Sequence, residues 1–219
     1  IIVNYSVMQK IILLETMIFG TICSTLLPMF GKWYGSNNFK LIIFNHNIFL
    51  KSLLTISSII IFFNVLFIKD IIEIWIGETK FIGKEVLLIL SLSIYVYISY
   101  TVSYCVIHSF NIKRKLTLII AAFETLFKIG LSFILTKYFG YIGVAIGVLA
   151  FGLLIEFPIY SWMLNHYSNK KVKLNYKFLI KHSLIMLINI YIIYYYIFYL
   201  DLSLRIILFF LISLLYLFS

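Results

Sequence analysis

The chain has 219 residues, of which 63% are hydrophobic and 12% charged, and its net charge is +10. Soluble globular domains carry about 25% charged residues, so this composition excludes a soluble domain and predicts a chain embedded in lipid. The positive charge does not point to nucleic acid, because the basic residues lie mostly in short gaps between apolar runs rather than in a stripe on a soluble surface.

Apolar runs of membrane-crossing length follow one another from one end of the chain to the other. A helix needs about 20 apolar residues to cross a hydrocarbon core about 30 Å thick. The expected spans lie near 11–30, 49–68, 86–107, 116–136, 142–163, 179–199 and 204–218. The sequence therefore predicts an all-α integral membrane protein of about seven transmembrane helices, forming a single transmembrane helical domain over residues 1–219.

Basic residues are unequally divided between alternate gaps, and this predicts an orientation. Lys and Arg near span ends resist translocation and stay in the cytoplasm. The first, third and fifth gaps contain no acid, and their basic residues are Lys32, Lys40, Lys113, Arg114, Lys115, Lys170, Lys171, Lys173 and Lys177. We expect these gaps on the inner side of a bacterial cytoplasmic membrane, with the N-terminus of this segment outside and the C-terminus inside. An outside N-terminus and a first residue other than Met suggest a fragment of a longer protein.

The second gap, residues 69–85, mixes charged residues with Ile71, Ile72, Ile74, Trp75 and Ile76. Two interpretations stay open for this gap. It is either a short segment lying on the outer membrane surface or an extension of the second span.

Catalytic, metal-binding and cofactor-binding patterns are missing from the sequence. The four histidines are isolated from one another, and the two cysteines lie inside apolar runs without metal or redox spacing. No glycine-rich phosphate loop occurs. We expect neither enzyme activity nor a metal or cofactor.

Charged residues deep inside the spans are the candidate functional residues. A charge at the centre of a membrane helix costs about 2.5–3.5 kcal/mol on insertion scales and usually faces a cavity or a partner. Four such residues occur: Glu15, Glu124, Lys128 and Glu156. Glu124 and Lys128 are four residues apart and share one helix face, so we expect them to form a polar element on a substrate or ion pathway. The alternative is ion pairing that only fixes helix packing.

The fifth predicted span carries small residues and a proline. Gly143 and Gly147 stand one helical turn apart, which predicts close packing against another helix. Pro158 follows Glu156 and lacks a backbone N–H, so we expect a kink there.

Three segments of the chain resemble segments of a known family. Residues 124–147, from Glu124-Thr-Leu-Phe-Lys to Gly143-Val-Ala-Ile-Gly147, are similar to the late helical hairpin of bacterial polysaccharide flippases of the O-antigen and capsule type. Leu26-Leu27-Pro28 before Lys32 resembles their recurrent span end, and Ile74-Trp75-Ile76-Gly77 is similar to their outer Trp-Leu-Gly segment. The family belongs with multidrug exporters and lipid II flippases in one superfamily. Its members usually carry twelve to fourteen spans in two bundles, so the resemblance implies that this chain is the second bundle with its terminal spans.

The resemblance implies transport of a polyprenyl-pyrophosphate-linked oligosaccharide to the outer leaflet, driven by an ion gradient. Lys128, or Lys113 and Arg114 at the cytoplasmic mouth, would attract the pyrophosphate. Lys128 departs from the family, which more often has a neutral polar residue such as Asn at that position. The implied partners are the lipid-linked oligosaccharide, membrane lipids, and a missing N-terminal half or a partner chain.

Two other functions stay open. A multidrug or cation antiporter of the same superfamily would share the fold but line its pocket with acids. A membrane polysaccharide polymerase or glycosyltransferase would need a sizeable outer loop with catalytic groups, and the longest outer gap here is residues 69–85.

Overall fold

The computed structural model describes residues 2–77, 81, 83–110, 114–172, 174–193, 195 and 201–217. All secondary structure over these residues is helical, which confirms the predicted all-α fold. The elements are α1 (Ile2–Gly35), α2 (Phe39–Trp75), α3 (Lys84–Ser109), α4 (Arg114–Phe139), α5 (Ile142–Phe151), the π-helix η2 (Gly152–Glu156), α6 (Phe157–Tyr167), α7 (Tyr176–Ile192) and α8 (Leu202–Leu217).

Five of the described helical spans are long and apolar enough to cross a membrane. They are α1, α2, α3, α4 and the continuous stretch Ile142–Tyr167, which joins α5, η2 and α6. The described parts of α7 and α8 have 17 and 16 residues and correspond to the last two predicted spans. Since each predicted span overlaps a described helix or a continuous helical stretch, the chain has the character of a multi-pass membrane protein.

The first two helices are much longer than the apolar runs that predict them. α1 has 34 residues and α2 has 37, because both helices continue into polar residues at their ends. The tight turn between them depends on asparagine. Asn37 adopts a left-handed φ of 54°, which asparagine tolerates better than most residues, and the Asn38 side chain accepts a hydrogen bond from the Leu41 N–H at the start of α2.

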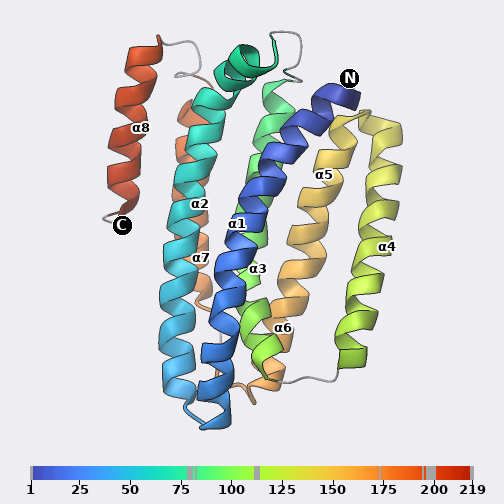
Figure 1. The fold of residues 1–219 in the computed structure, drawn as a ribbon, viewed down its shortest axis with the longest axis vertical. Coiled ribbons are helices and arrows are strands. Elements are labelled where there is room, and N and C mark those ends of the chain that lie inside the picture. The colour runs from blue at the N-terminus through green and yellow to red at the C-terminus, as the bar shows by residue number, and fades with distance from the viewer. Residues whose placement is uncertain are drawn as a thin grey trace.

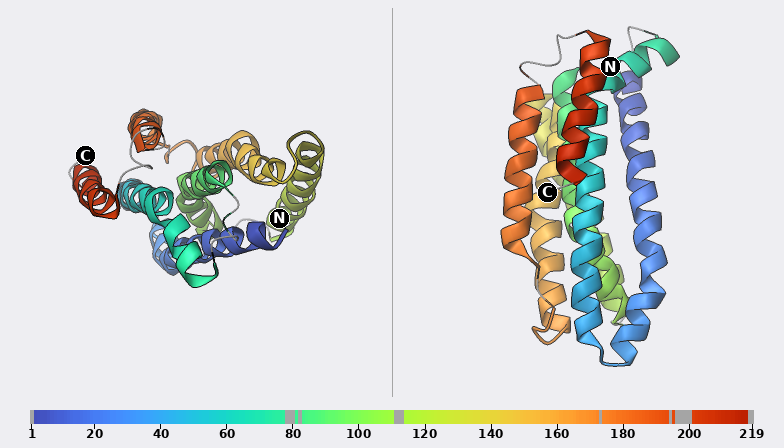
Figure 2. Two further views of the ribbon diagram at one scale, coloured as in Figure 1. Left: turned by 90° about the horizontal axis from the view of Figure 1, so that it is seen from above. Right: turned by 90° about the vertical axis from the view of Figure 1, so that its left-hand side faces the viewer.

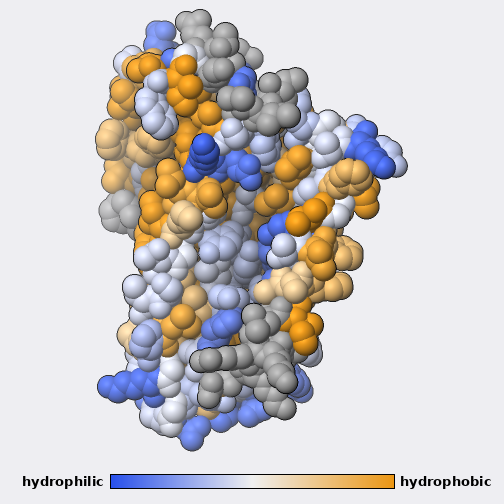
Figure 3. Space-filling model, turned by 45° about the vertical axis from the view of Figure 1, so that its right-hand side comes forward, coloured by the Kyte–Doolittle hydropathy of each residue, from blue (hydrophilic) through white to orange (hydrophobic). Residues whose placement is uncertain are grey.

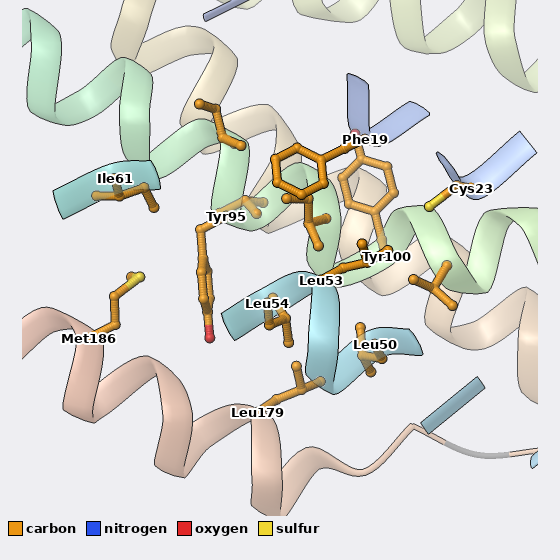
Figure 4. Packing of buried hydrophobic residues seen from close by; sticks show 14 of the residues in the cluster. Phe19, Cys23, Leu50, Leu53, Leu54, Ile61, Tyr95, Tyr100, Leu179 and Met186 are labelled. Atoms are coloured by element: carbon orange, nitrogen blue, oxygen red, sulfur yellow. The ribbon is translucent and has the colours of Figure 1, made fainter. Parts of the chain in front are cut away.

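The helices run alternately up and down, and α3 lies at the centre of the bundle (Figures 1 and 2). It contacts α1 and α2 on one side and α5, η2 and α6 on the other. Figure 4 shows Tyr95 of α3 reaching between Leu54 of α2 and Met186 of α7. Helices in lipid gain stability from such close packing, because lipid is as apolar as the side chains themselves.

The helix α4 lies at the rim of the bundle and packs on α5. No residue of its apolar stretch Ile119–Phe139 is buried within the described chain. This peripheral position leaves one face of α4 free to border a groove.

Two small residues of α5 allow the close contact between α5 and α4. A Cβ atom added to Gly143 would collide with the Leu135 carbonyl oxygen, and one added to Gly147 would lie 2.8 Å from the Ser132 Cα. Real atoms do not approach so closely, so only glycine fits at these two positions. The face predicted from the sequence to pack against another helix therefore lies against α4.

Replacing Gly147 by leucine is expected to lower the folded, membrane-inserted amount of protein strongly. Overpacking costs about 1–3 kcal/mol, and here the obstacle is the backbone of α4. Gly130→Leu is the matched control, because nothing lies within 4 Å of a Cβ added to Gly130. Thermal unfolding of the two purified variants in detergent measures the difference, and equal stability of both would contradict the packing.

Polar contacts tie the last two helices to the bundle. Arg205 of α8 donates through Nη1 to the Asp70 carboxylate and to the Leu66 carbonyl of α2, both at 2.7 Å. On α7, His182 Nδ1 lies 2.9 Å from the Tyr95 hydroxyl of α3, and the two rings stack. These contacts fix α7 and α8 on the side of the bundle away from α4 (Figure 2).

Candidate functional site

A groove of about 440 Å³ opens between α1 and α4, with α3 and η2 contributing to its walls. Its polar lining residues are Tyr5, Gln9, Thr16, Ser93, Tyr97, Tyr100, Lys128 and Glu156. Figure 3 views the molecule from this side and shows pale and blue side chains in the middle, between orange hydrophobic ones. The groove therefore brings polar side chains together with apolar ones within the membrane-crossing part of the bundle.

Two further pockets continue the groove along α3. One of about 310 Å³ shares Gly20, Tyr97, Tyr100 and Glu156 with the first pocket. The other, of about 100 Å³, shares two tyrosines with the second and reaches His108. We call these three pockets together the α1/α4 groove. From Leu90 to His108 it follows α3 for 18 residues, or about 27 Å at 1.5 Å per residue, which is close to the thickness of the hydrocarbon core.

A cluster of three polar side chains, which includes an ion pair, lies in the wall of the groove, and each side chain comes from a different helix. Lys128 Nζ of α4 donates to Glu156 Oε1 of η2 at 3.0 Å, and the Tyr100 hydroxyl of α3 donates to Glu156 Oε2 at 2.6 Å. The Glu156 side chain is only 10% exposed, whereas that of Lys128 is 35% exposed. Both carboxylate oxygens are thus satisfied, and the ammonium retains N–H donors and open space toward the groove.

A second carboxylate lies closer to the α3–α4 end of the groove. Glu124 Oε2 accepts a hydrogen bond from the Tyr160 hydroxyl at 3.0 Å, while Glu124 Oε1 is buried without a partner among the described residues. The Tyr160 ring stacks on Tyr100 at 5.4 Å and meets Tyr104 edge-on at 5.2 Å. A ladder of tyrosines therefore connects the carboxylates Glu124 and Glu156 along the groove.

The local backbone explains how Glu156 reaches its partners. Residues Gly152–Glu156 form a π-helix, and the Phe157 N–H bonds to the Gly152 carbonyl five residues earlier. Such segments accommodate an extra residue per turn and are frequent at functional sites. A Cβ on Gly152 would lie 2.9 Å from Val96 Cγ1, so the missing side chain lets η2 approach α3 closely. Pro158 lies at the start of α6 and has no N–H to restore α-helical bonding into η2.

The structure separates some of the residues that the sequence groups together. Lys128 pairs with Glu156, 28 positions away, and Glu124 on its own helix face bonds to Tyr160 instead. Glu15 lies outside the α1/α4 groove and accepts a hydrogen bond at 3.0 Å from Asn64 of α2.

The predicted cationic mouth lies largely outside the described residues. Lys113 lies outside the described residues, and Arg114 begins α4 without a described side chain.

Several groove residues are uncharged, so a search for buried charges in the sequence does not find them. Tyr97, Tyr100 and Tyr104 all line the groove, and their spacing of three and four residues places them on one face of α3. That spacing is visible in the sequence and is the signal that could have identified them. Gly152 carries no such signal, because its role depends on the neighbouring helix.

The chemistry available in the groove is binding of anions, exchange of protons on carboxylates, and hydrogen bonding to hydroxyl groups. Within the described part of the chain, no three His, Cys, Asp or Glu side chains gather in a way that suits a metal ion. Comparisons with protein-family models, with curated proteins and with solved structures give no match to this chain.

Proposed function

We propose that the chain belongs to a transporter that moves a lipid-linked oligosaccharide with an anionic headgroup across the bacterial cytoplasmic membrane. The observation that carries this proposal is the Lys128–Glu156–Tyr100 cluster, which faces a groove inside the membrane-crossing region. A solvated or ligand-accessible lysine at such a depth is costly and is usually functional. It offers a phosphate group a charged donor that is already desolvated in part.

The shape of the groove suits an amphiphile. A sugar-phosphate headgroup does not cross hydrocarbon unaided, since each unpaired polar group costs several kcal/mol there. The α1/α4 groove supplies hydroxyls and charges for a headgroup. The apolar side chains exposed beside it, such as Met17 of α1 and Phe123 and Phe127 of α4, suit a lipid tail. A lipid could thus move with its headgroup in the groove and its tail in the bilayer.

The residues of the groove distinguish this function from the alternatives. A multidrug exporter that selects cations would line its groove with acidic side chains only. Here Lys128 places a positive charge beside Glu156. A polymerase or glycosyltransferase needs catalytic groups in a large water-exposed loop, and the groove lies among the helices instead. Ion coupling would use the carboxylates Glu124 and Glu156, which share the groove with Lys128.

A second helical bundle is part of the proposal. Polar side chains such as Gln9, Thr16 and Lys128 line a groove that this chain leaves open at one side. Lipid tails cannot satisfy their hydrogen bonds. Another half of the same protein, or a partner chain, would face the groove and allow alternating access by rocking of the two bundles.

We also propose that the ends carrying the turn at Asn37 and the turn at Asn169 face the cytoplasm. Cysteine at Ser36 is expected to react with an impermeant thiol reagent only after the membrane is opened, whereas cysteine at Asp201 reacts in intact cells. Both positions are exposed, and the buried native cysteines Cys23 and Cys105 would be replaced by alanine. The reverse labelling pattern would overturn the orientation, and with it the assignment of the cytoplasmic mouth.

The transport proposal is tested with the whole protein in phospholipid vesicles that contain a fluorescent polyprenyl-pyrophosphate oligosaccharide. Transport is expected to expose inner-leaflet label to a membrane-impermeant reducing agent added outside, faster than in protein-free vesicles. The Gly130→Leu variant is the control for reconstitution, because that position faces open space. Label exposure at the protein-free rate, with correctly inserted protein, would reject the proposed substrate.

A further inference from the structure

The helix α2 is longer than a membrane crossing requires. Its 37 residues extend about 55 Å at 1.5 Å per residue, against a hydrocarbon core of about 30 Å. Figures 1 and 2 show its last turns tilted away from the rest of the helix, at the end of the bundle where α1 begins. These last turns, residues 69–76, lie at the end of the bundle, and Ile72 is the only buried residue among them.

Two charged residues of this segment share one side of the helix. Lys69 and Glu73 form an ion pair at 3.6 Å, four residues apart, and Asp70 holds Arg205 of α8. The bond to Arg205 fixes the base of the segment to the bundle. Ionic groups at this level mark the boundary between hydrocarbon and the polar layer.

The opposite side of the segment is an exposed apolar stripe. Ile71, Ile74 and Trp75 stand at positions i, i+3 and i+4 and so share a face. They are 37%, 87% and 74% exposed. Ile72, on another side, is fully buried against the bundle. The segment is thus amphipathic, with an apolar face that nothing in the described chain covers.

We propose that residues 69–76 form an interfacial anchor, whose Ile71, Ile74 and Trp75 face is inserted between lipid headgroups at the membrane surface. Amphipathic helices bury such faces at the boundary between headgroups and acyl chains, and indole favours that layer because its ring is apolar and its N–H is polar. A protein partner fits less well, since stable interfaces use about 20–30 residues a side and this stripe has three side chains. The anchor would fix the depth and tilt of α2, and through Asp70 and Arg205 those of α8.

Depth-dependent quenching of tryptophan fluorescence tests the anchor. The chain has three tryptophans, so Trp33→Phe with Trp162→Phe leaves Trp75 as the single reporter. The purified protein would be placed in phosphatidylcholine vesicles brominated either near the glycerol end or near the methyl end of the acyl chains. Trp75 emission is expected to lie at shorter wavelength than in the unfolded chain, and to be quenched more by bromine near the glycerol end.

A matched control calibrates the depth. Leu126→Trp, in a background with all three native tryptophans changed to phenylalanine, places an indole on the exposed face of α4 near mid-span, where bromine near the methyl end should quench best. Trp75 quenched like this control would mean that the segment extends the span, which would overturn the proposal. Two other results would overturn the proposal as well. One is unquenched Trp75 emission at the wavelength of a water-exposed indole. The other is loss of quenching because a second copy of the protein covers Trp75.

Discussion

Replacement of Lys128 by methionine is expected to lower the export rate about 10- to 150-fold, because a hydrogen bond to a charged group is worth about 1.5–3 kcal/mol. Methionine has a similar length but lacks the ammonium that lies over the Phe151 ring, and Lys128 is the only Lys or Arg among the described lining residues of the groove. The amount of protein in the membrane should stay near normal. Glu156 retains the hydrogen bond from the Tyr100 hydroxyl, which keeps its side chain in place.

Three companion variants separate a transport role from a packing role. Lys128→Arg retains the positive charge and should retain part of the activity, and Glu156→Gln should lose activity if the carboxylate couples ions. The double variant Lys128→Met with Glu156→Leu decides the matter. If the pair only holds α4 against η2, the single variants lose abundance, and the double variant restores both abundance and export because it removes both buried charges. Surface polysaccharide and protein abundance, measured together in cells lacking their own copy of the gene, give the two readouts.

The spans are the part of the fold that the sequence predicts well. Apolar runs of about 20 residues require helices in lipid, since every backbone polar group must be satisfied within the segment. Helix ends are less predictable, because hydropathy marks where the lipid ends and not where helical hydrogen bonding ends. The continuation of α2 to Trp75 illustrates this difference.

The partner of Lys128 shows why the site is harder to predict than the spans. Local spacing favours Glu124, four residues earlier on the same face. In the structure Lys128 pairs with Glu156, because α4 packs on the span that contains η2. Glu124 instead accepts a hydrogen bond from the Tyr160 hydroxyl. A contact over 28 positions depends on how helices pack, which periodicity within one helix does not specify. The charge of each residue is enough to identify it as a candidate functional residue, but it does not identify the residue's bonding partner.

The π-helix is a further feature that composition does not reveal. Its sequence, Gly152-Leu-Leu-Ile-Glu156, differs in no obvious way from an apolar α-helix. It forms where two packing requirements meet within one span. Gly147 must face Ser132 of α4, and nine residues later Glu156 must face Tyr100 of α3 as well as Lys128. The wider turn sets the rotation between these two faces.

Deletion of Leu154 is accordingly expected to abolish export without unfolding the bundle. The side chain of Leu154 is 74% exposed, so its removal leaves no cavity. A shorter segment can close ordinary i to i+4 hydrogen bonds, which stabilises the local backbone. The cost is register, because one residue fewer rotates the two ends of the span relative to each other by about 100° and shortens it by about 1.5 Å. As a result, either Gly147 no longer packs against α4 or Glu156 no longer pairs with Lys128.

Two variants isolate the effect of register. Leu154→Ala keeps the length of η2 and removes most of the same side chain, so it should transport normally. Deletion of Leu154 combined with an alanine inserted beside Tyr141, at the turn before α5, restores the total length but not the rotation between Gly147 and Glu156, so it should remain inactive. Export and membrane abundance are measured for all three variants. Normal export by the deletion variant would show that the orientation of Glu156 toward Lys128 is dispensable, because a regular α-helix cannot hold both faces at once.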